Sequence, residues 1–460
     1  MRSKMSHVQV IALGYFIMIL VGALLLMLPA ASADGRSAPF SAALFTSTSA
    51  SCVTGLIVRD TATGWSGFGQ AVILALIQVG GLGFMTIATL FYLLMRRRMG
   101  LRQREIMVES INTTQVGGIM RTTRTLVKRT LLFEGCGALL LSIRFIPQFG
   151  LGRGIWYSVF HAVSAFCNAG FDLMGVFAPY GSLVPYAGDA LVNLVIMALI
   201  TIGGLGFLVW EDLRRNGLHW KRYRLHTKLV LTVSAILTFG GALLLYLLEA
   251  HATGQGLSQP QRVLTALFAS VTARTAGFNT VDVAAMSEGG KLTTILLMAV
   301  GGSPGSTAGG IRTTTIAVVV LYAISSFRGQ AQPSVFGRRL SEQALRKSSN
   351  ILLFNVGLVL GASLVICSVQ GIALLDVLFE TFSAIGTVGM STGITRELAG
   401  LCKGLVIALM YLGRVGSVSF AVALLEKKAR PPDVPAEIDG TGERRSVADA
   451  GHGLHGLVLL

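Results

Sequence analysis

Apolar stretches of two lengths alternate along this chain of 460 residues. About 20 apolar residues cross a bilayer as a helix, whereas a stretch of ten to fourteen can only enter and return. The pattern predicts an all-α integral membrane protein of four pseudo-symmetric repeats, each a helix, a re-entrant half-helix with a loop, and a second helix. The first helices are expected at about 8–29, 125–147, 226–249 and 347–370, the half-helices at about 39–52, 156–167, 260–273 and 374–386, and the second helices at about 69–95, 187–210, 290–325 and 401–425.

The four short stretches end in the same local pattern. Each ends in two residues that are small, polar or β-branched, then a glycine, then a large apolar residue. The glycines are Gly55, Gly170, Gly277 and Gly389, at intervals of 107 to 115 residues. A single such glycine could belong to an ordinary loop, but four in the same context indicate a repeated structural unit.

Non-helical backbone inside a membrane is tolerated only where it is buried in protein or lines a cavity. Four such segments around one central pore would present rings of carbonyl oxygens, which can replace the hydration shell of a cation. Glycine suits such a crowded axis, because it has no Cβ and adopts positive φ cheaply. The half-helices would also direct their partly negative C-terminal ends at the pore. The predicted filter residues are Val53, Thr54, Gly55, Asn168, Ala169, Gly170, Thr275, Ala276, Gly277, Thr387, Val388 and Gly389.

Composition supports a membrane protein and assigns its sides. Apolar residues make up 52% of the chain and charged residues only 13%, against about 25% in soluble domains. The net charge of +16 arises from basic clusters between the apolar stretches, the positive-inside arrangement, which predicts cytoplasmic N- and C-termini rather than nucleic-acid binding. The five cysteines have no disulfide or zinc spacing.

Two glycine-rich features mark the second helices. Gly80-Gly81-Leu82-Gly83-Phe84 recurs as residues 203–207, with a variant at 413–416, and is interpreted as close helix packing. The third repeat instead carries ten residues that cannot continue a helix, namely Gly301, Gly302, Ser303, Pro304, Gly305, Ser306, Thr307, Ala308, Gly309 and Gly310. We expect this segment to be a gate beneath the filter. A phosphate-binding loop, which would need GK[ST] after a strand, and an inert kink are the alternatives.

Two arginines lie close to the expected gate. A charge within a spanning segment is costly and functional by default, so Arg414 in the last helix is expected to bind carbonyl groups of the gate. Arg312 follows the gate segment directly and is expected to extend toward the cytoplasmic interface.

The four loops resemble those of a known group of transporters. VTGL at 53–56, SAFCNAGFD at 164–172, TARTAGFN at 272–279 and TVGMSTGIT at 387–395 are similar to the filter loops of the KtrB/TrkH/HKT superfamily of potassium and sodium transporters. The chain enters its first repeat at once and so most resembles the KtrB branch. This resemblance implies K⁺ as the transported ion, a homodimer in the bacterial cytoplasmic membrane, an intramembrane gating loop with an arginine beside it, and a cytoplasmic KtrA-like ring that supplies the nucleotide site. Glycine rather than serine at position 55 favours potassium over sodium.

The predicted division of the chain follows the repeats. Repeat 1 is expected at 1–95, a cytoplasmic linker at 96–124, repeat 2 at 125–225, repeat 3 with its broken second helix at 226–345, repeat 4 at 346–428 and a cytoplasmic tail at 429–460. The predicted function is potassium uptake without catalysis. A sodium-selective or Na⁺-coupled relative, a polytopic membrane enzyme and a non-conducting protein of the same architecture stay open as alternatives.

Overall fold

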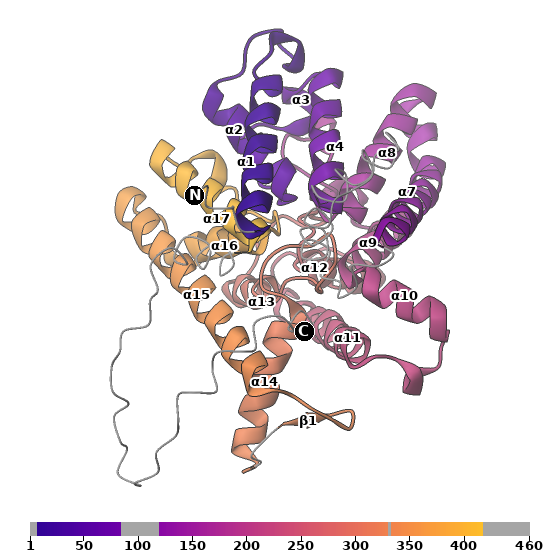
Figure 1. Cartoon of the computed structure of the whole chain (residues 1–460). Coiled ribbons are helices and arrows are strands. Elements are labelled where there is room, and N and C mark those ends of the chain that lie inside the picture. The colour runs from indigo at the N-terminus through magenta and orange to yellow at the C-terminus, as the bar shows by residue number, and fades with distance from the viewer. Residues whose placement is uncertain (1–6, 84–118, 330–332, 417–460) are drawn as a thin grey trace, which may run out of the picture.

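The computed structural model describes residues 7–83, 119–329 and 333–416, which form helices arranged in a ring around one centre. Figure 1 shows the four repeats following one another around this centre, with the first at the top, the second at the right, the third below and the fourth at the left. The expected linker before residue 119 and the expected tail lie outside the described residues.

Each repeat opens with a long helix and continues with a half-helix. The long helices are α1 (His7–Leu26), α7 (Ile119–Phe149), α11 (Leu225–Leu248) and α15 (Glu342–Gln370), and the half-helices are α2 (Phe40–Cys52), α8 (Leu151–Phe166), α12 (Gln259–Thr272) and α16 (Leu374–Gly386). Every half-helix packs against the long helix of its own repeat. The long helices expose large apolar side chains such as Phe16, Leu139, Phe239 and Leu364, as expected of surfaces that face lipid.

The second helices are shorter and interrupted. They are α4 (Gly67–Leu82), α9 (Ala190–Leu205) followed by α10 (Phe207–Asn216), α13 (Glu288–Met298) followed by α14 (Thr313–Phe327), and α17 (Gly400–Val415). Short elements join the helices: α3 (Thr61–Gly64), 3₁₀ turns at Pro29–Ala31, Met174–Val176, Val184–Tyr186, Trp220–Arg222 and Ile394–Arg396, and an antiparallel hairpin of β1 (Ser334–Val335) and β2 (Arg338–Arg339).

Contacts between repeats close the ring. The second helix of each repeat packs against the half-helix of the next: α4 on α8, α9 on α12, α13 on α16, and α17 back on α2. This cyclic pattern surrounds the half-helices with the longer elements. The predicted fold class, an all-α membrane protein of four pseudo-symmetric repeats, is therefore confirmed.

The glycine-rich motif packs helices closely, as predicted. A Cβ added at Gly80, Gly203 or Gly413 would collide with the carbonyl oxygen of Ser51, Phe166 or Ile385, respectively. Each of these carbonyls belongs to the last turn of a half-helix. The second helices therefore touch the half-helix backbones directly, which requires glycine at these positions.

The same motif also ends the second helices, which the sequence analysis did not anticipate. Its last glycine has φ of +85° at Gly83, +84° at Gly206 and +98° at Gly416. For repeat 2, the prediction of one continuous second helix at about 187–210 was wrong, because the chain bends by 94° between α9 and α10. Among the described residues, four helices are long and apolar enough to cross a membrane, or five if the bent pair of α9 and α10 is counted as one span.

A largely buried ion pair joins repeats 3 and 4. Lys291 of α13 is 8% exposed, and its Nζ lies 3.0 Å from Asp376 Oδ1 of α16. Asp376→Asn should lower the free energy of unfolding by about 2 kcal/mol, because it leaves the buried ammonium of Lys291 without a partner. The loss is not larger because the Asp376 side chain is partly exposed, so that water already weakens the ion pair. Thermal unfolding of the purified protein in detergent measures this. Lys291→Met combined with Asp376→Leu should lose much less, and an equal loss in both variants would contradict the ion-pair explanation.

Candidate functional site

The four predicted filter glycines meet at the centre of the ring. A Cβ added at Gly55 would lie 2.6 Å from the Ala169 carbonyl oxygen and 3.1 Å from Gly170 Cα. The same relation holds from Gly170 to Ala276 and Gly277, and from Gly277 to Val388 and Gly389. An added Cβ at Gly389 would collide with the Thr54 carbonyl oxygen and lie 2.9 Å from Gly55 Cα. The four segments form a closed cycle, and each glycine is required because a Cβ would collide with the neighbouring segment.

The backbone conformation repeats along with the contacts. The four glycines have φ of +95°, +70°, +83° and +94°. Two residues before each of them stands a non-glycine residue that also has positive φ, from +50° to +67°: Val53, Asn168, Thr275 and Thr387. Positive φ in β-branched residues is a true outlier and costs on the order of 1–3 kcal/mol each. Such strain persists only where the surroundings fix the backbone firmly, and it is concentrated at functional sites.

Hydrogen bonds to the half-helices hold these segments in place. The backbone N–H of Thr54, Ala169 and Val388 each donates to the carbonyl six residues before its repeat's glycine, at 2.8 Å. The N–H of Gly55 donates to Ser49 Oγ at 3.0 Å, and that of Gly389 donates to Ser383 Oγ at 3.1 Å. The ring is therefore preorganised by the half-helices from which it emerges.

The third repeat departs from this pattern. Ala276 N–H donates to the Thr272 carbonyl at 2.9 Å, four residues back instead of five. Thr272 Oγ1 then donates to the Phe278 carbonyl at 2.7 Å, a role that Ser164 fills for Phe171 in repeat 2. The ring is therefore only approximately fourfold symmetric.

Oxygen atoms are the groups at this centre that could hold a cation. The four half-helices end directly before the ring, so their partly negative ends converge there. The buried hydroxyl groups of Thr275 and Thr387, at equivalent positions, have no hydrogen-bond partner among the described residues. Nowhere in the described residues do three or more His, Cys, Asp or Glu side chains gather closely enough to bind a metal ion. The site suits a cation bound by neutral oxygens.

The predicted gate segment lies between Ala299 and Thr313 as an irregular loop directly beside the ring. Gly301 N–H donates to the Ile311 carbonyl at 2.8 Å, and Thr313 N–H donates to the Gly302 carbonyl at 3.1 Å, which closes the loop at its base. A Cβ added at Gly309 would collide with the side chain of Thr387. Thr307 Oγ1 lies 3.2 Å from the Asn168 side-chain amide. The loop therefore touches filter residues of repeats 2 and 4.

Other contacts tie the loop to the glycine motifs of its neighbours. Ser303 N–H donates to the Gly204 carbonyl and Thr307 N–H donates to the Gly203 carbonyl, at 3.1 and 3.3 Å. Gly310 N–H donates to the Gly413 carbonyl at 3.2 Å, and Phe207 N–H donates to the Gly305 carbonyl at 3.1 Å. The loop is therefore joined to repeats 2 and 4 by individual hydrogen bonds rather than by regular secondary structure.

Arg414 joins this loop to two other repeats. It lies in the last turn of α17, and its Nη1 donates to the Thr307 carbonyl. Its Nη2 donates to the carbonyls of Gly80 and Gly81, and its Nε lies 3.4 Å from the Tyr15 hydroxyl. In the described part of the chain its partners are all neutral oxygens. The predicted contact between Arg414 and the gate loop is present in the structure; its role in gating stays a prediction.

Two further arginines have contacts that the sequence did not indicate. Arg312 turns back onto the gate loop, where its Nη1 donates to the Ala308 carbonyl at 2.5 Å. Arg274, which directly precedes Thr275, was not predicted as a site residue. Its guanidinium donates to Ser234 Oγ at 2.9 Å and to Thr238 Oγ1 at 3.2 Å, which anchors the third loop to α11. The equivalent positions in the other repeats hold small residues, Cys52, Cys167 and Gly386. An arginine at this position was the sequence feature that could have identified Arg274 as special.

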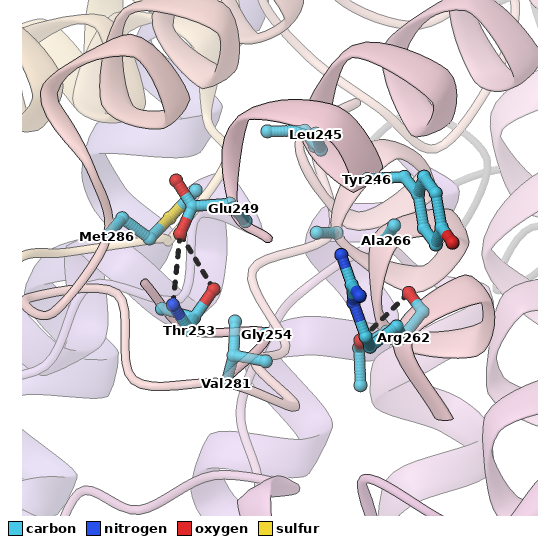
Figure 2. Close-up of a pocket in the computed structure, with 11 residues that line it drawn as sticks. Leu245, Tyr246, Glu249, Thr253, Gly254, Arg262, Ala266, Val281 and Met286 are labelled. Carbon is cyan, nitrogen blue, oxygen red and sulfur yellow. Dashed lines mark hydrogen bonds between the residues drawn. The ribbon is translucent and has the colours of Figure 1, made fainter. Parts of the chain in front are cut away.

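A pocket at the end of α11 lies apart from the ring. Leu245, Ala266 and Met286 are among the residues that line it, and Glu249 lies at its edge (Figure 2). The Glu249 carboxylate is already used, because it accepts hydrogen bonds from Thr253 and from Ser287. Arg262 stacks on the Tyr246 ring at 4.9 Å. The one acidic side chain among the lining residues is therefore fully engaged in hydrogen bonds.

Comparisons with known proteins agree with this architecture. The family model described as "TrkH: Cation transport protein" matches residues 4–429. The chain is 39% identical to the potassium/sodium uptake protein NtpJ of Enterococcus hirae, over 93% of this chain and 95% of that protein. It is 38% identical to the Ktr system potassium uptake protein B of Bacillus subtilis, over 92% of this chain and 95% of that protein.

A solved structure is similar in fold. The potassium transporter TrkH from Vibrio parahaemolyticus matches with a TM-score of 0.69 at 18% sequence identity, over 92% of this chain and 85% of that one. The family model matches nearly the whole chain, and the two relatives are 39% and 38% identical to it over more than nine tenths of its length. The chain therefore belongs to the TrkH family of cation transport proteins and is a membrane transporter, not an enzyme.

Proposed function

We propose that this protein takes up potassium ions through a path that crosses the ring of Gly55, Gly170, Gly277 and Gly389. The observation that carries this proposal is the closed cycle of contacts among these glycines, with the same positive-φ backbone in all four repeats. A cation that enters the ring would exchange water for carbonyl oxygens of the four segments, which the half-helices hold at fixed positions. The unpartnered hydroxyls of Thr275 and Thr387 add two oxygens on the same segments.

The loop between Ala299 and Thr313 is proposed as the gate. It touches Thr387 and Asn168 of the filter segments, so it occupies the space that an ion leaving the ring would need. Arg414 and Arg312 bring two guanidinium groups to the carbonyls of this loop, and neither forms an ion pair in the described residues. Their charge opposes a cation at this point, and Arg414 holds the loop to Gly80 and Gly81 of repeat 1. Opening requires release of these contacts.

We propose potassium rather than sodium as the transported ion on two grounds. A ring of backbone carbonyls with glycine in every repeat suits the larger and more easily dehydrated ion. Two of the relatives carry potassium uptake in their names, although one of these names includes sodium. Sodium transport or sodium coupling is therefore the second candidate.

The surroundings of the path are proposed from family resemblance and charge. The chain is expected to lie in the cytoplasmic membrane with both termini in the cytoplasm, as the basic segments between spans indicate. A homodimer with one path per subunit, and a cytoplasmic nucleotide-binding ring of the KtrA type, follow from the resemblance to the KtrB branch. The name of the relative from Bacillus subtilis, a component of a Ktr system, is in keeping with partner subunits.

The first test concerns ion selectivity. Gly277→Ser places a side chain toward Gly170 and Gly389, so the preference for potassium over sodium should fall by about tenfold or more, equivalent to about 1.4 kcal/mol. Potassium and sodium uptake are measured in cells that lack their own potassium transporters. Gly256→Ser is the matched control, because Gly256 lies in the same repeat with φ of +81° and has open space around it. Unchanged selectivity in Gly277→Ser would place the filter elsewhere.

The second test concerns the gate. Arg414→Ala removes the bonds that join the loop to repeat 1, so potassium flux should rise by about tenfold, the equivalent of about 1.4 kcal/mol of lost restraint. Flux is measured in proteoliposomes with a potassium gradient. Lys403→Ala in the first turn of the same helix removes the same charge away from the loop and should leave flux unchanged. A decrease of flux in well-folded Arg414→Ala protein would contradict this role for Arg414.

A further inference from the structure

Aromatic, apolar and basic side chains gather at one corner of the molecule, away from the ion path. We name this the corner surface and define it as residues 214–228 together with residues 333–339. Leu218 is 96% exposed, and Trp220 and Phe336 are 42% and 44% exposed. Large apolar side chains this exposed are unfavourable in water, so a surface that combines them with many cations indicates a specific neighbour.

The corner surface is a fixed structure. Asp212 of α10 accepts hydrogen bonds from Asn216 Nδ2 at 2.7 Å and from Arg224 N–H at 2.9 Å, which closes the turn between α10 and α11. The Trp220 and Phe336 rings meet edge to face at 6.1 Å. Lys228 Nζ lies 5.8 Å from the Phe336 ring and donates to the Lys221 carbonyl at 3.4 Å. The turn and the β1–β2 hairpin therefore form one surface.

This surface is strongly positive. Its two segments contain no aspartate or glutamate. The nearby Glu211 is paired with Arg129 at 3.3 Å, and Asp212 uses its carboxylate oxygens internally. The exposed basic residues are Arg214, Arg215, Lys221, Arg222, Arg224, Arg338 and Arg339. The surface thus offers several cations to a partner with negative charge.

The position of the corner surface favours a lipid over a protein. The apolar 24-residue helix α11 begins at Leu225, so the turn before it lies where this helix enters the bilayer. The bend of 94° between α9 and α10 turns α10 away from the direction of α9, and its basic last turn with Arg214 and Arg215 leads into this turn. Tryptophan and tyrosine beside lysine and arginine are typical of the boundary between headgroups and acyl chains.

We propose that the corner surface binds anionic phospholipid headgroups of the cytoplasmic leaflet. The guanidinium groups of Arg338 and Arg339 and the turn residues Lys221 and Arg222 would bind the phosphate and the anionic headgroup. Leu218 and Trp220 would lie against the upper part of the acyl chains. The proposal rests on the membrane orientation given under the proposed function, and it does not depend on the ion path, so each can fail separately.

Fluorescence of Trp220 tests this directly. The purified protein is placed in nanodiscs of phosphatidylcholine that contain increasing fractions of brominated phosphatidylglycerol or brominated phosphatidylcholine. The Trp220 signal is the difference between the wild type and Trp220→Phe. We expect brominated phosphatidylglycerol to quench it at a mole fraction at least about tenfold lower than brominated phosphatidylcholine does, because each nearby cation contributes about fivefold and more than one lies at this surface.

The control variants separate charge at this surface from charge in general. Arg338→Gln with Arg339→Gln should lower the preference for the anionic lipid by at least about fivefold, while Lys221 and Arg222 retain part of it. Arg36→Gln with Arg153→Gln changes the net charge equally at exposed positions near the N-terminal ends of two half-helices, and should retain the preference. Equal quenching by both lipids in the wild type, or an unchanged preference in the hairpin variant, would overturn the proposal. So would a hairpin variant that keeps the lipid preference but loses binding of a soluble cytoplasmic partner, because the surface would then be a protein-docking site.

Discussion

Backbone that leaves a helix inside a membrane must find hydrogen-bond partners within the protein, and this constraint shapes the whole molecule. The four ring segments direct their N–H groups back into the half-helices, as Thr54, Ala169 and Val388 do. Their carbonyl groups then lie against the neighbouring segment, at distances that exclude a Cβ. The half-helices need support in turn. In repeats 1, 2 and 4 the second helix of the same repeat provides it through glycine contacts, and the second helix of the preceding repeat packs on the other side. The proposed cation path follows the carbonyl oxygens that these segments bring together at the centre.

The departures from fourfold symmetry are concentrated in the third repeat. Its second helix is replaced over Val300–Arg312 by a loop, its filter segment is bonded one residue differently, and it carries Arg274 where the other repeats have small residues. The loop also gathers contacts from repeats 2 and 4 through Gly203, Gly413 and Arg414, and Arg414 in turn bonds to Gly80 of repeat 1. One repeat thus differs at the segment that we propose as the gate.

The features that could be predicted from sequence are those that repeat. The spacing of Gly55, Gly170, Gly277 and Gly389 and the length of the half-helices indicated the ring, because both follow from local chemistry and recurrence. The break at Gly206 could not be predicted, since a glycine motif has the same appearance whether it packs a helix or ends it. The partners of Arg312, Arg274 and the gate loop were also out of reach, because Ala308, Ser234 and Gly203 become neighbours only through the closed arrangement of the repeats. The assignment of filter and gate roles stays a prediction.

The most direct measurement of the central claim is the position of a bound ion. Crystals of the protein grown with rubidium in place of potassium would locate the ion by its anomalous scattering. We expect the principal rubidium site on the axis enclosed by Gly55, Gly170, Gly277 and Gly389, in contact with carbonyl oxygens of all four segments. Rubidium bound elsewhere with this ring empty, in a protein that transports rubidium, would contradict a filter built from the four glycine segments.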